Sequence, residues 1–281
     1  MTVFQKVIKY LAIAFAIFLT VSIIGGIFTC ISGISFIFSG FSGIDKEAVG
    51  EMQEYPIDGD ISSLSIDLSG AELIIETSDK FSVETNHNYI SVSNDDGELC
   101  INETKKLFSY FPKGITVILY IPEDFVFESA EVETGAGKVE IDSLSADVLK
   151  LSLGAGEVKI NNLEANSRAD IDGGVGALII DGGRLCNLDL DMGVGALKLK
   201  SHIEGESKLD YGVGETELTL LGSLDDYKIE LDKGIGEAKL DGESMRDDSV
   251  YGSGENFIEI DGGIGEINIE FSEYELQKTA Q

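Results

Sequence analysis

A column of acidic residues gives the sequence its clearest opportunity for chemistry. Seven Gly-x-Gly motifs recur along the chain, and an oxygen-bearing side chain stands two residues before the first glycine of each. If the motifs stack in register, these side chains lie ~4.8 Å apart, and like charges at that spacing need relief. The column consists of Glu133, Ser152, Asp172, Asp191, Asp210, Asp232 and Asp261.

Calcium is one source of that relief, because it is a hard cation that binds carboxylate oxygens. The pattern departs from the calcium-binding β-roll, which has a nine-residue repeat with an aspartate after its glycines. The alternative is a solvated acidic face, relieved by Lys138, Lys159, Lys198 and Lys239. Calcium aside, we expect no cofactor. The weak candidates for metal ligands are Asp172, Asp191, Asp210, Asp232 and Asp261.

Material for catalysis is scarce. The chain has two histidines, His87 among polar residues and His202 at an expected corner, and we expect both to be exposed. No serine stands in a G-x-S-x-G nucleophile elbow. The three cysteines lack the spacing of a zinc site. We therefore assign no catalytic residue and predict that the protein is not an enzyme.

The Gly-x-Gly motifs themselves reveal an internal repeat. Their first glycines, at positions 135, 154, 174, 193, 212, 234 and 263, are separated by 19, 20, 19, 19, 22 and 29 residues. A nucleotide-binding glycine motif would open a helix whose N-terminus holds phosphate, whereas the pattern after each motif is that of a strand. The glycines are therefore expected to be structural.

The positions around each motif alternate between apolar and polar residues. A period of two indicates strands with one buried face. The middle residue of each motif is also apolar, and we expect it to join apolar ladders inside the coil. A repeat this short needs neighbours to complete its core. The sequence therefore predicts an all-β, β-helix-like solenoid of ~19–20-residue repeats. A propeller would need longer blades, and a sandwich would lack this regularity.

Four further regions complete the expected organisation. Residues 34–57 are a linker, residues 58–114 form a membrane-proximal β cap without the motif, residues 115–271 hold the repeats, and residues 272–281 are a polar tail. Unrepeated caps are what the ends of an exposed solenoid require.

The N-terminal region has the pattern of one transmembrane α-helix. The stretch from Tyr10 to Ile44 has no charged side chain, and residues 10–33 are long enough to cross a bilayer. Lys6 and Lys9 precede it, so the positive-inside rule places residues 1–9 in the cytoplasm and the β domain outside the cell membrane. The alternative is a cleaved signal peptide, whose apolar region would be shorter. We favour an uncleaved signal anchor.

Charge narrows the range of partners. The net charge is −31, and residues 45–281 hold 18 basic and 51 acidic residues, a net of −33. Such a domain repels nucleic acid and anionic lipid headgroups, so we expect no nucleic acid partner. Cationic partners, divalent metals or a cationic wall polymer are better matched to it.

Two segments resemble a known family. They are ITVILYIPEDFVFESAEVETGAGKVEI (residues 115–141) and IEIDGGIGEINIEF (residues 258–271). With the repeated G-A-G and G-V-G units between them, they resemble the bacterial "putative adhesin" or toast-rack domain of unknown function. The resemblance implies an extracytoplasmic cell-envelope protein, in a family with no defined catalytic residues and often found near envelope-stress systems.

Three functions are therefore weighed. The first is a non-catalytic envelope scaffold or interaction protein that serves envelope-stress sensing or adhesion and whose partner is an envelope protein or wall component. The second is an acidic module that binds cations or the cell wall. The third and weakest is a wall hydrolase.

Overall fold

A computed structural model describes residues 50–104 and 114–273. The expected anchor (10–33), the cytoplasmic segment (1–9), most of the linker and nearly all of the tail lie outside these residues. In the described part of the chain, no helix is long and apolar enough to cross a membrane. Met1–Lys46 and Glu47–Gln281 are separate units, and the description below concerns the second.

The described residues form one sheet of seventeen strands and a single 3-10 turn, η1 (Leu224–Asp226). The strands are β1 (Gln53–Pro56), β2 (Ser63–Leu68), β3 (Glu72–Ser78), β4 (Ser82–Thr85), β5 (Ile90–Asp95), β6 (Glu98–Glu103), β7 (Thr116–Pro122), β8 (Val126–Asp172), β9 (Val175–Ile180), β10 (Gly183–Cys186), β11 (Leu188–Glu204), β12 (Glu206–Leu221), β13 (Tyr227–Asp232), β14 (Ile235–Leu240), β15 (Glu243–Ser244), β16 (Ser249–Gly252) and β17 (Asn256–Ser272).

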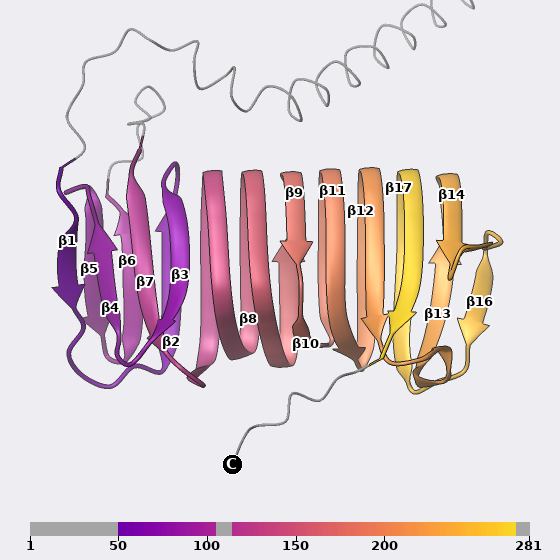
Figure 1. The fold of residues 1–281 in the computed structure, drawn as a ribbon, viewed down its shortest axis with the longest axis horizontal. Helices are drawn as coiled ribbons and strands as arrows, with labels where there is room; N and C mark the ends of the chain where they lie inside the picture. Colours follow the sequence, from indigo (N-terminus) through magenta and orange to yellow (C-terminus); the bar gives the residue numbers. More distant parts are fainter. Residues whose placement is uncertain (1–49, 105–113, 274–281) are drawn as a thin grey trace, which may run out of the picture. The chain divides into compact units, whose positions relative to one another are not determined.

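The central strands pair in parallel, and their motifs lie side by side. In β11 and β12, Gly195 pairs with Gly214, and Gly214 in turn pairs with Gly265 of β17. The long strands β8, β11, β12 and β17 each bend at their motifs, so that one arm runs before the bend and one after it (Figure 1). Each repeat position therefore stacks on the same position of its neighbour.

The core lies between the two arms of the bent strands. Residues three positions before the first glycine are buried, as Leu190 and Leu209 are. Residues four and six positions after it, such as Leu197 and Leu199, are buried from the other arm. Alternation thus sends one side chain of every two inward, and the expected alternating strands are confirmed.

Both ends of the row depart from sequence order. β17 pairs with β12 on one side and with β13 and β14 on the other. The last repeat in the sequence therefore occupies the second-to-last place in the row (Figure 1). At the other end, β2 and β3 lie between β8 and the β6–β7 pair.

Antiparallel strands close the two ends. β4 pairs with β7 and β1 with β4 at one end, and β16 pairs with β13 at the other. Such strands cover edges that would otherwise recruit further chains. β7, which follows the expected boundary between residues 114 and 115, pairs with β3 and β4 of the expected cap.

The glycines of the motif are required by close packing. Gly195, the second glycine of its motif, has a φ of 147°, in the region that favours glycine. A Cβ there would overlap the carbonyl oxygen of Gly176 in the adjacent strand. At the bend, the backbones of adjacent strands lie so close together that a side chain at this position has no room.

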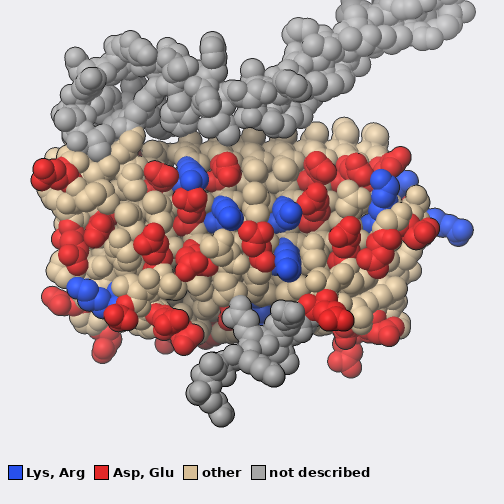
Figure 2. All heavy atoms as spheres, in the orientation of Figure 1, with Lys and Arg blue, Asp and Glu red and all other residues tan. Residues whose placement is uncertain are grey.

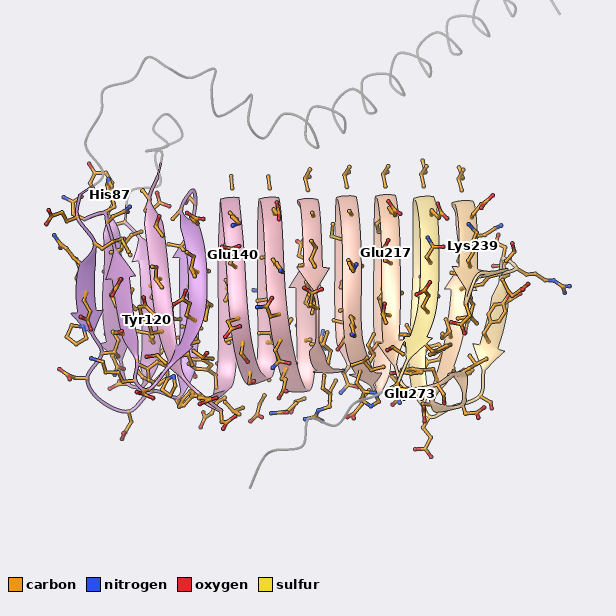
Figure 3. The ribbon with its side chains drawn as sticks, viewed as in Figure 1. His87, Tyr120, Glu140, Glu217, Lys239 and Glu273 are labelled. Carbon is orange, nitrogen blue, oxygen red and sulfur yellow. The ribbon has the colours of Figure 1, made fainter. Side chains whose placement is uncertain are left out.

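The middle residues of the motifs do not lie inside the coil, which corrects our expectation. Ile235 is 70% exposed, Ile264 51% and Val175 42%. Because the backbone turns outward at the bend, the residue between the glycines points away from the core, and short side chains stand off the bends along the row (Figure 3). The remaining middle residues are exposed (Ala136, Ala155) or partly exposed (Val194, Val213).

Candidate functional site

The five candidate aspartates lie in a single row. Strand register pairs Asp172 with Asp191 and Asp191 with Asp210. Asp210 in turn pairs with Asp261, and Asp261 with Asp232. The sequence therefore predicted correctly that these aspartates share one column. It did not predict their order, because β17 stands before β13 in the row.

Lys208 relieves part of this row. Its Nζ lies 2.9 Å from Oδ2 of Asp210 and 3.2 Å from Oδ2 of Asp261, so one ammonium bridges two adjacent carboxylates. Hydrogen bonds to both carboxylates raise the pKa of Lys208. The row is also relieved at its ends, where the amides of Gly174 and Gly234 donate to Asp172 (3.2 Å) and Asp232 (3.1 Å).

The lysines named from the sequence stand elsewhere. Lys138, Lys198 and Lys239 follow their glycine motifs and therefore belong to the other arm. They form ion pairs with glutamates of that arm: Glu140 at 2.7 Å, Glu217 at 3.5 Å and Glu266 at 2.9 Å (Figure 3). Lys159 also follows its motif, in register with Ile179. The expectation that these lysines relieve the aspartate row is thus wrong, because the bend separates the two columns.

The row does not form a metal cage. Among the described residues, no group of three or more His, Cys, Asp or Glu side chains is arranged to hold a metal ion. Calcium takes six to eight oxygen ligands, whereas a straight row offers a cation only its two adjacent carboxylates. On the face shown in Figure 2, acidic side chains are spread over the whole series of strands, with basic side chains among them.

We expect Lys208→Gln to lower the melting temperature by a few degrees at low ionic strength. The change leaves Asp210 and Asp261 side by side without the ammonium between them. Added salt screens exposed charges, so the difference from wild type should at least halve at 0.5 M NaCl. Thermal unfolding followed by circular dichroism measures it, with Lys200→Gln, at an exposed lysine of β11, as control. A deficit that is equal at both salt concentrations would contradict an electrostatic role.

A second polar cluster lies on the paired strands β10 and β11, and the side chain of Tyr227, at the start of β13, reaches it. Glu204 is at its centre: its Oε2 lies 3.3 Å from Nη1 of Arg184 and accepts from Sγ of Cys186 at 3.4 Å. Its Oε1 lies 3.2 Å from Nε2 of His202. The hydroxyl of Tyr227 lies 3.3 Å from Nδ1 of the same histidine.

This cluster has the residue types of a cysteine hydrolase but not the arrangement. Burial raises the pKa of the Cys186 thiol, and its hydrogen bond to Glu204 raises it further. A nucleophilic cysteine needs the opposite shift. The carboxylate of Glu204 contacts both the thiol of Cys186 and the imidazole of His202. In a catalytic Cys–His pair the imidazole itself would contact the thiol. The cluster therefore stabilises the pairing of β10 with β11.

The pKa of Glu204 is lowered: burial alone would raise it, but Cys186, Arg184 and His202 outweigh burial. A lowered carboxyl pKa contributes stability at neutral pH that is lost as the pH falls through the folded-state value. We expect Glu204→Gln to reduce the melting temperature at pH 7 and to match wild type near pH 3. A difference that is constant from pH 7 to pH 3 would contradict this.

His87 is also structural, and its expected exposure is wrong. It is buried, its Nδ1 accepts from the amide of Tyr89 at 3.2 Å, and its ring lies 4.4 Å from the ring of Tyr89. His202 is only partly exposed, with Nδ1 2.8 Å from the carbonyl of Leu221. The alternating pattern did not reveal these burials, because His87 lies outside the strands, beside a turn, and His202 is covered by Tyr227 from a later part of the chain.

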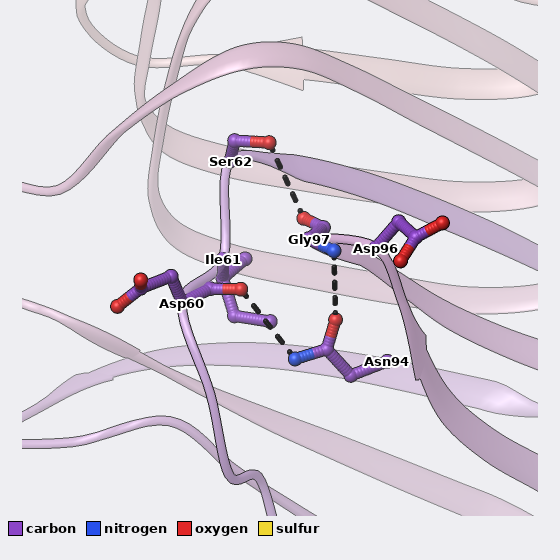
Figure 4. A pocket seen from close by; sticks show the side chains of 6 residues that line it. All are labelled: Asp60, Ile61, Ser62, Asn94, Asp96 and Gly97. Atoms are coloured by element: carbon purple, nitrogen blue, oxygen red, sulfur yellow. Dashed lines mark hydrogen bonds between the residues drawn. The ribbon is translucent and has the colours of Figure 1, made fainter.

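A shallow depression opens near the start of β2 (Figure 4). Its polar groups bond mainly to one another: Asn94 donates to the carbonyl of Asp58 at 2.9 Å and accepts from the amide of Gly97 at 3.1 Å. No histidine or lysine lines it. Asp60, Ile61, Ser62, Asn94, Asp96 and Gly97 line the depression.

Comparison with known proteins gives one family and a set of distant structures. The family model described as Toastrack DUF4097 matches residues 61–270. No curated protein matches the chain. A crystal structure of a putative cell adhesion protein from Clostridium sporogenes is 17% identical and covers 79% of this chain and 99% of its own, with a TM-score of 0.34.

Two further crystal structures are similar at the same level. A putative adhesin from Bacteroides fragilis is 14% identical and covers 78% of this chain and 95% of its own, with a TM-score of 0.39. A putative adhesin from Parabacteroides distasonis is 15% identical and covers 79% and 98%, with a TM-score of 0.33.

Proposed function

Because this chain belongs to the Toastrack DUF4097 family, we propose that it is a non-catalytic scaffold or interaction protein of the cell envelope. The observation that carries the proposal is the in-register pairing of the motifs, with Gly176, Gly195, Gly214 and Gly265 side by side. We infer that such a stack is a β-solenoid, an architecture that presents long rows of equivalent positions. Rows of this kind suit adhesion to an extended partner or the sensing of envelope stress.

We further propose that residues 10–33 anchor the protein as a single-pass, uncleaved span, with residues 1–9 in the cytoplasm. The lysines before the span and the acids after it favour this orientation. The β domain then stands outside the cell, where its partner is an envelope protein or a wall component.

Cysteine labelling in intact cells tests this arrangement. The full chain carries one new cysteine at Lys159, which is exposed, in a Cys30→Ala, Cys100→Ala background; the buried Cys186 stays. We expect a membrane-impermeant maleimide to label Lys159→Cys before lysis, and the protein to stay with the membranes in alkaline carbonate. The matched control is a cysteine at Thr2, which should be labelled only after lysis. The reverse pattern would overturn the proposal.

Cation binding is the second candidate, favoured by the row of five aspartates. For a scaffold that does not depend on metal, we expect the melting temperature to differ by no more than a few degrees between calcium and a chelator. A calcium-dependent rise of many degrees, abolished by Asp210→Asn with Asp261→Asn, would make cation binding the leading function instead.

A further inference from the structure

One edge of the β domain carries an exposed apolar row that the scaffold function leaves unexplained. We call it the bend ridge. It consists of the middle residues of the seven motifs, and strand pairing sets their order in space. From the β8 end to the β14 end, the ridge reads Ala136, Ala155, Val175, Val194, Val213, Ile264, Ile235.

The ridge has three properties in common with surfaces that meet a flat apolar phase. It is straight, because equivalent positions stack at ~4.8 Å. It stands clear of other side chains, because each member lies between two glycines. Its side chains also grow steadily in size from alanine through valine to isoleucine, and the two isoleucines, Ile264 and Ile235, are 51% and 70% exposed.

The described chain begins at the same edge. The amide of Gly50 donates to the carbonyl of Asn86 at 2.9 Å, and Asn86 in turn donates to the carbonyl of Gly114. Residue Ile115 follows, and its carbonyl accepts from the amide of Glu72, beside the bend between β2 and β3. β1 accordingly starts at the edge where the strands bend (Figure 1). Residue 50, the first that the structure describes, therefore lies at the alanine end of the ridge.

We propose that the bend ridge rests on the lipid surface of the membrane that anchors the chain. The inference depends on the proposed anchoring through residues 10–33. The sixteen residues 34–49 can reach ~55 Å, against a ridge of ~29 Å at the stacking distance, so the tether permits contact along the whole ridge. A tethered surface also meets the bilayer at high effective concentration, so weak contacts suffice.

The size gradient fits this role. The end of the ridge near Gly50 is held at the membrane by the chain itself and needs little apolar side chain. The far end, at Ile264 and Ile235, is held only by its own contacts and carries the largest exposed side chains. Aliphatic side chains of this kind bind an interface by burying apolar area in its outer layer.

A second copy of the chain fits the ridge less well. A stable interface buries about 800 Å² on each partner, far more than one row of small side chains supplies. Acidic columns also follow the ridge: Asp191 and Asp210 stand two positions before their motifs, and Glu215 and Glu266 directly after theirs. Two such edges would repel each other, and the same columns restrict the ridge to lipid that carries little net negative charge.

Depth-dependent quenching tests the proposal on the full chain in phosphatidylcholine vesicles. Single cysteines replace Ile235, Ile264 or Val175 in the Cys30→Ala, Cys100→Ala background and carry an environment-sensitive fluorophore. Nitroxide-labelled lipids quench fluorophores within the bilayer. We expect blue-shifted emission and at least threefold stronger quenching at Ile235→Cys and Ile264→Cys than at the control Val148→Cys. Val148 is 43% exposed but lies on a strand arm.

Each outcome decides a different point. Water-like emission and equal quenching at positions 235 and 148 would overturn the inference. Disulfide-linked dimers of Val194→Cys would overturn it too, since they place a second copy on the ridge. Loss of the chain from floating vesicles in carbonate would instead show that the anchoring itself fails. Phosphatidylglycerol should weaken the quenching, and 0.5 M salt should restore it, because the acidic columns repel an anionic surface.

Discussion

Gly195→Ala is expected to lower the melting temperature of the domain by about 10 °C or to prevent folding. The new Cβ would overlap the carbonyl oxygen of Gly176 in the adjacent strand, and the φ of 147° disfavours any side chain. The contact is between two backbones, so neither side can rotate away. Overpacking costs about 1–3 kcal/mol and occasionally more, the unfavourable φ adds to this cost, and each kcal/mol is worth ~2–4 °C in a domain of this size. Circular dichroism of the full chain in detergent measures the change.

Two controls separate the clash from other effects of the methyl group. Gly242 also has a positive φ, of 80°, but nothing lies within 4 Å of its added Cβ. Gly242→Ala should therefore cost only the backbone strain, about 1 kcal/mol. Val194→Ala, one residue before Gly195, removes part of a side chain outside the core and should change little. An equal loss in all three variants would contradict a packing role for the motif glycine.

Much of the fold follows from the spacing of the motifs. Equal intervals predict that Gly176, Gly195 and Gly214 stack, and alternation predicts that Leu190 and Leu209 are buried; the strand register and the burial agree. Both predictions rest on periodicity that can be read along the sequence: the interval between successive motifs and the alternation within each strand.

Order along the row could not be predicted in the same way. All seven motifs carry nearly the same apolar columns, so β17 and β13 are equally good neighbours for β12 in their inward-facing residues. What distinguishes them lies between repeats. Tyr227 packs beside Phe271, with ring centroids 5.9 Å apart, and the amide of Gly222 donates to the carbonyl of Ser272.

The candidate site shows the same limit of periodicity. Sequence spacing placed Asp172, Asp191 and Asp210 in one column, and the strands bring them together. It did not show which side of the coil each column occupies, because a Gly-x-Gly bend can turn either face of the chain inward. The outward bend moves Lys138 to the other arm and turns Val175 outward.

Truncation before Asn256 is expected to unfold the β13–β16 end while the rest of the stack survives. β17 is the parallel partner of β12 on one side and of β13 and β14 on the other, so its removal breaks all three pairings. Buried side chains of β17, among them Ile260 and Ile267, also leave the core. Because repeats contact only their neighbours, β2, β3 and β8 should keep their hydrogen bonds.

Hydrogen exchange followed by mass spectrometry measures this in the full chain and in the truncated form. We expect residues 227–252 to lose at least tenfold in protection, residues 206–221 to lose part of theirs, and residues 126–172 to be unchanged. Truncation after Glu273 is the matched control, since it keeps all of β17, and should leave every segment protected. If residues 227–252 stay protected without β17, then β13 and β14 can take its place against β12, and the repeats are interchangeable in fact as well as in pattern.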